Sequence, residues 1–371
     1  MGQQKNQEIE ALRGIAVALA VTSHGANLLF WMGDSIERSG YSFWAGVDVF
    51  FAISGFVIAK AFADRLGTWR EIAAFFVRRA FRLLPTSWLW LFVVIALSAE
   101  FNSTWVFTTP GSNISDLWSV VLNVSNFHFA HCYEDISKST CGYNGQYWSL
   151  SLEEQFYLLF PLLILLPRRW FMLLSVATVF AWEHAFSFIP ANDATYIYLT
   201  RVSPIFLGVC IARLIGTRLY ADAEPVKLAG RIVPVVLVFA LMKSTSLASV
   251  SMGSAAIVWI ASYGRGYFFA PCTIRRVFEW LGARSFAVYL IHNPVFWFTR
   301  ELWSRIRPGV TFDHHYTIAF LATALPLLLL LAEINYRVVE TPLRDIGARL
   351  ANRFTGSKQG RSSGLSIAQQ D

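Results

Sequence analysis

The stretch EALRGIAVALAVTSHG, residues 10–25, decides how the rest of the chain is interpreted. Between its ends it is apolar enough to begin a membrane span, which needs about 20 residues. It nevertheless contains Arg13 and His24. At about 100° and 1.5 Å per residue, the two side chains share one helix face, about 16 Å apart along the axis. Ionisable groups in a bilayer are costly and normally face a bundle interior or a cavity.

Taken singly, each of the two residues has an ordinary explanation. Arg13 fits an anchor whose charged end reaches the membrane surface, and His24 fits an interhelical hydrogen bond. The polar residues in the other apolar stretches decide whether these ordinary explanations hold or whether the helices enclose an internal polar site.

The composition is that of a polytopic membrane protein. Of 371 residues, 55% are hydrophobic and only 15% are charged, with a mean hydropathy of +0.46. Soluble proteins contain about 25% charged residues. The sequence therefore predicts an all-α integral membrane protein. The net charge of +7 indicates basic cytoplasmic loops, and we expect no nucleic-acid partner.

Ten stretches are long and apolar enough to predict transmembrane helices. They are residues 11–32, 43–62, 79–99, 147–167, 170–189, 196–216, 230–246, 249–265, 279–299 and 316–337. Placing both termini in the cytoplasm puts most Lys and Arg residues inside, as the positive-inside rule requires. We expect one membrane domain over residues 1–345 and a disordered cytoplasmic tail over 354–371, which is polar and poor in apolar residues.

The longest predicted outer loop covers residues 100–146. Its cysteines, Cys132 and Cys141, lie close together on an oxidising face, which predicts a disulfide. His128 and His131 stand beside Cys132, but their spacing is a weak metal signal. We expect no bound metal.

Polar residues recur in the second and third predicted spans. Asp48 lies in an otherwise apolar run and needs a basic partner, for which His24 and Arg13 are nearest in sequence. Arg79 and Arg82 are one helical turn apart and share a face. Such a pair can grip a phosphate, although simple anchoring at the cytoplasmic surface explains it too.

The fourth and ninth spans add two further polar stripes. Ser149, Glu153 and Tyr157 repeat every four residues, and Tyr289 and His292 are spaced to share a face. Together the spans predict an internal polar cavity reachable from both faces. That arrangement suits either a transporter or an enzyme that transfers a group across the membrane.

The motifs in their order resemble those of the acyltransferase-3 family of integral membrane acyltransferases. The matching segments are LRGIAVALAVTSH with Arg13 and His24, GVDVFFAISGF at 46–56, the pair Arg79 and Arg82, WSLSLEEQFY at 148–157, Ser285 with Tyr289, Leu290 and His292, and Glu340 to Pro342. The resemblance implies transfer of an acyl group, usually acetyl, from cytoplasmic acyl-coenzyme A to a hydroxyl of a surface or exported glycan, or of a lipid-linked sugar. It also implies the bacterial inner membrane. Family members often carry an SGNH domain after the helices, whereas this sequence ends shortly after the tenth predicted span, so we expect a stand-alone form.

The resemblance and the chemistry together suggest catalytic roles. His24 would serve as general base or as transient acyl carrier, and Asp48 or Glu153 would orient its imidazole. Coenzyme A phosphates would bind three arginines, and other residues would line the acceptor side. The donor-binding residues are Arg13, Arg79 and Arg82, and the acceptor-side residues are Ser149, Tyr157, Tyr289 and His292.

A multipass transporter or receptor with a polar core is the alternative. A transporter would be expected to show inverted repeats or Gly/Pro-broken helices in matching halves. Neither is evident in the sequence, and the motifs gather in the first four predicted spans. The acyltransferase reading is therefore favoured.

Overall fold

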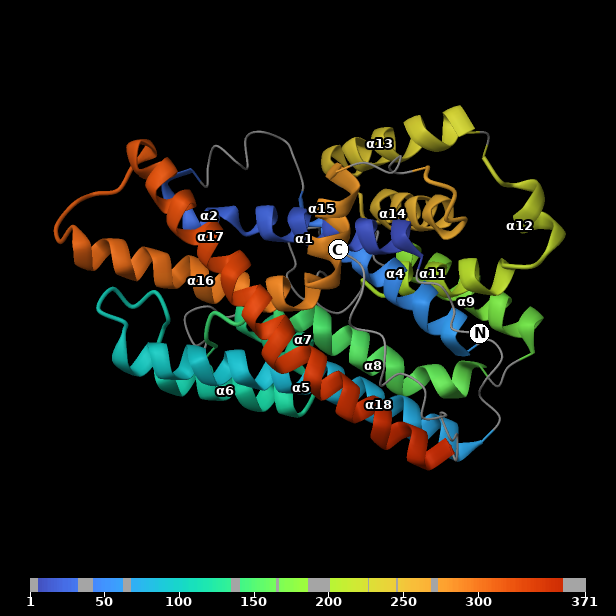
Figure 1. Cartoon of the computed structure of the whole chain (residues 1–371), viewed down its shortest axis with the longest axis horizontal. Coiled ribbons are helices and arrows are strands. Elements are labelled where there is room, and N and C mark those ends of the chain that lie inside the picture. The colour runs from blue at the N-terminus through green and yellow to red at the C-terminus, as the bar shows by residue number, and fades with distance from the viewer. Residues whose placement is uncertain are drawn as a thin grey trace, which may run out of the picture.

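The computed structural model describes residues 6–32, 43–62, 68–134, 141–164, 167–185, 201–225, 227–244, 246–267 and 273–355. Over these ranges the regular structure is helical and contains no strand (Figure 1), which confirms the predicted all-α fold. In chain order the elements are α1 (Gln7–Ser23), α2 (Gly25–Leu28), η1 (Phe30–Met32), α4 (Ala45–Phe62), α5 (Trp69–Glu100), α6 (Pro110–Val121), α7 (Ser125–Glu134), α8 (Tyr147–Ile164), α9 (Arg168–Ala185), α11 (Ser203–Leu214), α12 (Arg218–Asp222), α13 (Lys227–Lys243), α14 (Leu247–Ser262), α15 (Thr273–Ala283), α16 (Ser285–Ile306), η4 (His314–Tyr316), α17 (Thr317–Asn335), η5 (Tyr336–Glu340) and α18 (Thr341–Thr355).

Two helical runs in the described chain are long and apolar enough to cross a bilayer by themselves. They are α5 and the continuous run His314–Thr355. α11 and α14 are apolar but shorter. The other predicted spans overlap helices, although parts of the spans 147–167, 170–189, 196–216 and 230–246 lie outside the described residues. The number of crossings and the side of each terminus stay predictions. The predicted disordered tail lies almost wholly outside the described residues.

Three predicted spans differ from the helices observed. The helix expected over 11–32 ends at His24, whose ring Nδ1 lies 3.0 Å from the carbonyl oxygen of Ala20. A side chain that binds the carbonyl four residues earlier competes with the helical ladder. The span 279–299 is divided at Arg284 between α15 and α16. The last span continues beyond 337 through the π-helical turn η5 into α18.

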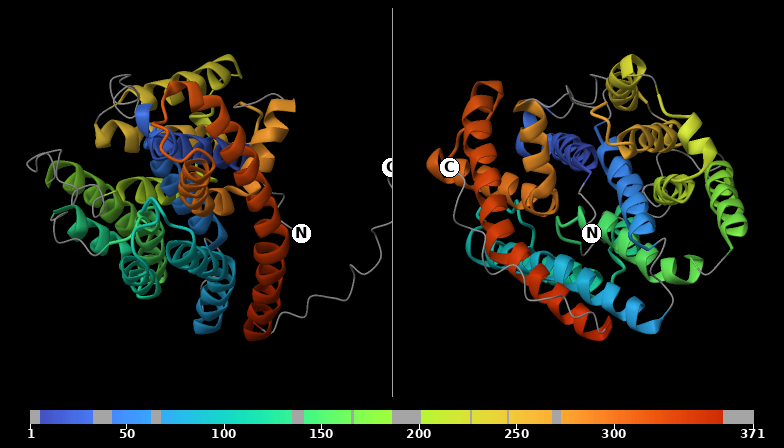
Figure 2. Two further views of the ribbon diagram at one scale, coloured as in Figure 1. Left: turned by 90° about the vertical axis from the view of Figure 1, so that its left-hand side faces the viewer. Right: turned by 45° about the vertical axis from the view of Figure 1, so that its right-hand side comes forward.

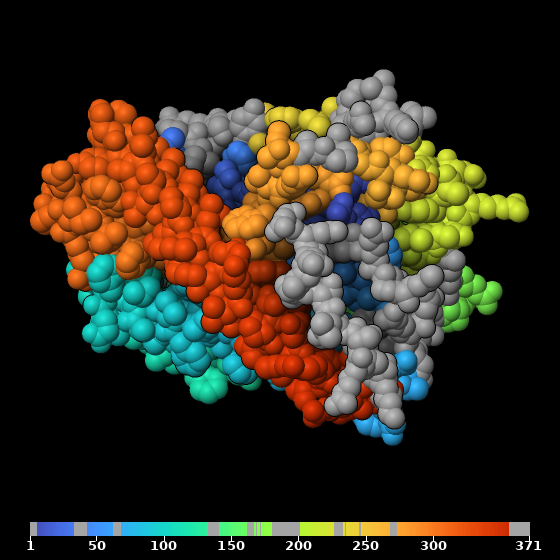
Figure 3. Space-filling model, viewed as in Figure 1, coloured from blue at the N-terminus to red at the C-terminus, as the bar shows by residue number. Residues whose placement is uncertain are grey.

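α5 and α18 lie side by side, and α18 crosses the face of the molecule seen in Figures 1 and 3. Their packing is close at Gly347, where a Cβ would overlap the side chain of Phe81. The start of α5 and the end of α18 project together from the other helices (Figure 2). A capping box of Thr68 and Glu71 begins α5, which fixes where this long helix starts.

α6 and α7 bury polar side chains and expose apolar ones. Asn113 and Asp116 are fully buried, and Ser125 is buried beside them. The outward residues of the pair include Ile114, Trp118, Val121, Leu122 and Phe127. A helix pair in water shows the reverse pattern. This arrangement suits a surface that faces lipid.

α4 and α11 approach until their backbones touch. A Cβ on Gly55 would overlap the carbonyl oxygen of Ile205, and a Cβ on Gly208 would overlap that of Ala52. Glycine at both positions permits this contact, as small residues commonly do between membrane helices. The contact holds the helix that carries Asp48 against the segment that begins near Arg201.

Replacing Gly208 with alanine is expected to destabilise the protein, because the new methyl group meets backbone rather than a flexible side chain. Overpacking of this kind typically costs about 1–3 kcal/mol. Gly253→Ala is the matched control, since its Cβ would meet only the side chain of Leu241. Thermal unfolding of the detergent-purified proteins measures the difference. Equal melting temperatures for Gly208→Ala and Gly253→Ala would contradict the close approach of the α4 and α11 backbones.

Candidate active site

A cavity lies between α1, α4, α5, α8 and α16. It encloses about 660 Å³ of empty space, counting its open mouth. Its polar lining comprises Arg13, Ser54, Arg79, Arg82, Ser149, Glu153, Ser285 and Tyr289, with Phe50 and Phe51 among the apolar residues. Residues far apart in sequence therefore meet here, as the polar stripes predicted.

Glu153 is held by partners within the cavity wall. Its Oε1 accepts a hydrogen bond from the Ser54 hydroxyl at 2.5 Å and lies 3.6 Å from Nη2 of Arg79. The Arg79 guanidinium also stacks 4.0 Å from the ring centre of Tyr157. The expectation that Glu153 orients His24 is not met, because its carboxylate is engaged by Arg79 and Ser54.

Arg82 and Arg13 add positive charge to the same cavity. Arg13 lies 3.8 Å from the carboxylate of Glu10. Within the ranges that the structure describes, Arg82 has no carboxylate oxygen within ion-pair distance. A cavity lined by a guanidinium that has no direct ion pair suits a phosphate or another anion, which arginine binds through several N–H groups.

His24 and His292 form a direct pair. Nε2 of His292 lies 3.1 Å from Nδ1 of His24, and the ring centres are 4.9 Å apart. Nδ1 of His292 lies 2.6 Å from the carbonyl oxygen of Tyr289. A carbonyl only accepts, so in the neutral ring this nitrogen carries the hydrogen and Nε2 is an acceptor.

The tautomer of His24 follows from that of His292. Its Nδ1 faces two acceptors, Nε2 of His292 and the carbonyl oxygen of Ala20. Nδ1 of His24 therefore carries the hydrogen, and Nε2 keeps its lone pair. That lone pair is the group a general base or a nucleophile requires. His292, which was expected to line the acceptor side, is in direct contact with His24, and its place on the acceptor side stays a prediction.

Asp48 has a different partner from the one expected. Its carboxylate binds the guanidinium of Arg201 through both oxygens. Arg201 also lies over the rings of Trp44 and Trp148. The expectation that Asp48 pairs with His24 or Arg13 is wrong, since a buried carboxylate is best compensated by a two-point guanidinium contact. Arg201 was a basic residue in an apolar stretch, and that was its sequence signal.

Tyr289 connects the arginine-lined cavity with the histidine pair. Its hydroxyl lies 2.7 Å from that of Ser149 at the cavity wall. Its backbone carbonyl binds His292, and the two rings are 5.7 Å apart. The cavity therefore ends at a residue that contacts the pair. Tyr157 lies elsewhere, in a second pocket between α5 and α8 that shares Arg79 and Leu83 with the first.

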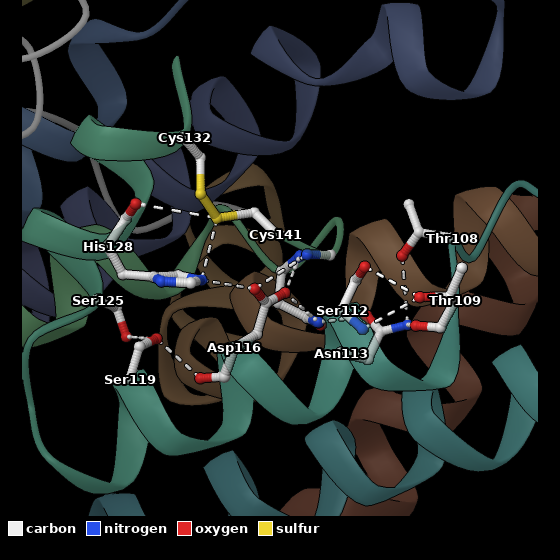
Figure 4. Close-up of polar contacts among 12 residues, drawn as sticks. Thr108, Thr109, Ser112, Asn113, Asp116, Ser119, Ser125, His128, Cys132 and Cys141 are labelled. Atoms are coloured by element: carbon white, nitrogen blue, oxygen red, sulfur yellow. Dashed lines mark hydrogen bonds and ion pairs between the residues drawn. A yellow bond between two sulfur atoms is a disulfide. The ribbon is translucent and has the colours of Figure 1, made fainter. Parts of the chain in front are cut away.

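The segment before α8 is fastened by a disulfide and a buried carboxylate (Figure 4). The structure joins Cys132 to Cys141. Oδ1 of Asp116 accepts from the backbone N–H of Gly142 at 3.0 Å and lies 3.0 Å from Nε2 of His128. The position of the turn that leads into α8 is therefore fixed from both sides of Cys141.

Glu301, near the end of α16, fastens the chain that follows α5. Its carboxylate accepts hydrogen bonds from the backbone N–H and hydroxyl groups of both Ser103 and Thr104, and it also binds Arg305. Burial by itself would raise the pKa of Glu301, but these hydrogen bonds lower it to about 2. The residue lies beyond the predicted span 279–299.

Acid is expected to weaken this contact. The pKa of Glu301 is lower in the folded protein than its ordinary value of 4.5, so its contribution is complete above that value and is lost as the pH falls towards 2. Melting temperatures measured between pH 6 and pH 3 should fall less for Glu301→Gln than for the unmodified protein. Parallel pH profiles for the two proteins would contradict the assignment.

Comparison with known proteins agrees with this geometry. The sequence profile of the acyltransferase-3 family, described as "Acyltransferase domain", matches residues 6–333. The chain is 24% identical to the "Peptidoglycan O-acetyltransferase OatA" of Listeria monocytogenes, over 94% of this chain and 57% of that protein. It is 26% identical to the "O-acetyltransferase OatA" of Staphylococcus aureus, over 85% of this chain and 55% of that protein.

A third relative is the "Putative peptidoglycan O-acetyltransferase YrhL" of Bacillus subtilis, which is 24% identical over 93% of this chain and 56% of that protein. The chain thus spans just over half the length of these curated relatives. No solved structure matches it. Because the family profile covers nearly all of its helices, this membrane protein belongs to the acyltransferase-3 family.

Proposed function

We propose that the protein transfers an acyl group, most simply acetyl, from cytoplasmic acyl-coenzyme A to a hydroxyl group of a cell-envelope glycan. The observation that carries this proposal is the arginine-lined cavity whose wall, at Tyr289, contacts the histidine pair. The named relatives, peptidoglycan O-acetyltransferases of bacteria, support a cell-wall glycan as acceptor, and the inner (cytoplasmic) membrane is the location we propose.

The arginines of the cavity bind the acyl donor in this proposal. Arg79, Arg82 and Arg13 would hold the phosphates of coenzyme A, whose long thin arm would carry the thioester towards His24. The rise of α1 places Arg13 and His24 about 16 Å apart, a distance that this arm can cover.

His24 activates the acceptor hydroxyl in this proposal. Its Nε2 would remove the proton from the acceptor hydroxyl while the oxygen attacks the thioester carbonyl. The carbon–sulfur bond then breaks, and coenzyme A leaves as a thiolate that takes up the proton held by Nε2 of His24. The imidazolium formed on His24 would be stabilised because its Nδ1–H donates to Nε2 of His292, much as the acid stabilises the imidazolium of a triad.

A second route uses the same groups in two steps. Nε2 of His24 would attack the thioester, carry the acyl group and release coenzyme A, and the acceptor hydroxyl would then take the acyl group from the imidazole. Incubation with acyl-labelled coenzyme A and no acceptor separates the routes. Label on the wild type and not on His24→Ala indicates the carrier route, and label on neither indicates direct transfer.

The proposal is tested by the release of free coenzyme A from acetyl-coenzyme A by the purified protein in lipid nanodiscs. Release is expected to rise when soluble peptidoglycan fragments or another cell-envelope glycan fraction is added. A protein that neither binds acetyl-coenzyme A nor releases the thiol in the presence of these fractions would contradict the proposal.

A further inference from the structure

Two buried amides stand in the turn that leads into α8, on the side of the histidine pair. Asn144 and Gln146 are each 1% exposed. Among the residues that the structure describes, Oδ1 of Asn144 and Nε2 of Gln146 have no hydrogen-bond partner. Buried polar groups are normally paired, so two unpaired ones so close in sequence require an explanation.

The free atom of Asn144 is fixed as an acceptor. Its Nδ2 donates to Oδ1 of Asn113 and to Oδ2 of Asp116, each at 2.8 Å. Asn113 in turn donates from its own Nδ2 to the carbonyl oxygens of Phe107 and Thr109. In each of these hydrogen bonds only one of the two atoms can be the donor, so the free atom of Asn144 is its carbonyl oxygen (Figure 4 shows the Asn113 and Asp116 side of this network).

The free atom of Gln146 is a donor at the end of a chain of amides. Asn27 donates from Nδ2 to Oδ1 of Asn293 at 3.0 Å, and Asn293 donates from Nδ2 to Oε1 of Gln146 at 3.1 Å. Asn27 is three residues from His24, and Asn293 follows His292. The Gln146 amide is therefore tied to both elements that carry the histidines.

The backbone between the two amides borders open space. A Cβ built on Gly145 would meet no heavy atom within 4 Å. The hydroxyl oxygens of Ser149 and Tyr289 both lie within hydrogen-bond distance of the carbonyl oxygen of Gln146, at 3.3 and 3.1 Å. The turn thus lies beside the histidine pair and against the wall of the arginine-lined cavity.

We propose that Asn144 and Gln146 form a subsite for a neutral sugar hydroxyl of the acceptor, with Gly145 leaving room for the ring. A hydroxyl donates one hydrogen bond and accepts others, so it satisfies both an amide oxygen and an amide N–H. Binding one hydroxyl here would present a neighbouring hydroxyl of the same sugar to Nε2 of His24. The subsite rests on the proposed function and specifies its acceptor as an uncharged polyhydroxyl group.

Two variants test the subsite by independent means. Gln146→Glu keeps an oxygen for Asn293 and loses the donor, and Gly145→Leu fills the space beside the turn. Gln7→Glu is the matched control, because this exposed glutamine accepts from Arg275 through Oε1, an acceptor that a carboxylate keeps. Full-length proteins in nanodiscs are compared at saturating acetyl-coenzyme A, with peptidoglycan fragments, or another cell-envelope glycan fraction that the wild type acylates, as the varied acceptor.

For both test variants, the acceptor concentration that gives half-maximal transfer is expected to rise at least about fivefold. The loss of one buried hydrogen bond has an effect of this size. Binding of acetyl-coenzyme A by both variants should be unchanged, and Gln7→Glu should behave as wild type. Variants that lower only the maximal rate or the melting temperature would overturn the subsite and leave the proposed function standing. A wild type that transfers to no envelope fraction would overturn both.

Discussion

Replacing His24 with alanine is expected to lower acyl transfer by about a hundredfold to ten thousandfold, the usual contribution of a positioned proton-transfer group. Binding of acyl-coenzyme A should persist, because the arginine-lined cavity does not include His24. Turnover assays and equilibrium binding on the same preparation separate the two effects. His131→Ala is the control, since this histidine is exposed and lies on α7.

His292 offers a graded version of the same test. His292→Gln keeps a side chain that can accept from Nδ1 of His24, whereas His292→Leu does not. Activity should therefore fall in the order wild type, glutamine, leucine, and the pH profile of the glutamine variant should differ from that of the wild type.

A His24→Ala protein with more than a tenth of the normal rate would remove the histidine pair from the chemistry.

Replacing Arg82 with glutamine is expected to raise the KM for acyl-coenzyme A by roughly tenfold to a hundredfold. A hydrogen bond to a charged group contributes about 1.5–3 kcal/mol, and about 1.4 kcal/mol corresponds to a factor of ten. Arg82 is a cleaner target than Arg79, whose removal would also leave the carboxylate of Glu153 without its ion-pair partner.

The control for this prediction is Arg78→Gln on the same helix. Arg78 is exposed and does not line the cavity. Its substitution should leave the KM for the donor nearly unchanged. The Arg82 effect should shrink as salt is raised, because screening weakens the wild-type contact as well. Equal KM changes for both arginine variants would show that net charge, and not the cavity, governs donor binding.

The sequence identified polar residues in unusual positions more successfully than it identified which residues contact one another. Polar side chains in apolar spans were recognisable because burying them is costly, and Arg79, Arg82, Ser149 and Glu153 do meet in one cavity. Helix periodicity relates side chains on one helix only. It could not show that Asp48 binds Arg201, a partner 153 positions away.

The break at His24 was missed for a related reason. The apolar run continues past it to Trp31, and hydropathy does not register a side chain that binds its own helix. The buried amides of Asn144 and Gln146 gave no signal at all, since asparagine, glycine and glutamine are ordinary residues of a turn. Their arrangement became evident only with the hydrogen bonds of Asn113, Asp116 and Asn293.

The most direct test of the central claim is acyl transfer across a sealed bilayer. Proteoliposomes of known protein orientation are loaded with acetyl-coenzyme A on one side only, and glycan acceptor is supplied on the other. The account predicts O-acetylated glycan only when the donor faces the side that carries Arg79 and Arg82, and at least about a hundredfold less of it with His24→Ala. Transfer that requires donor and acceptor on the same side would contradict it.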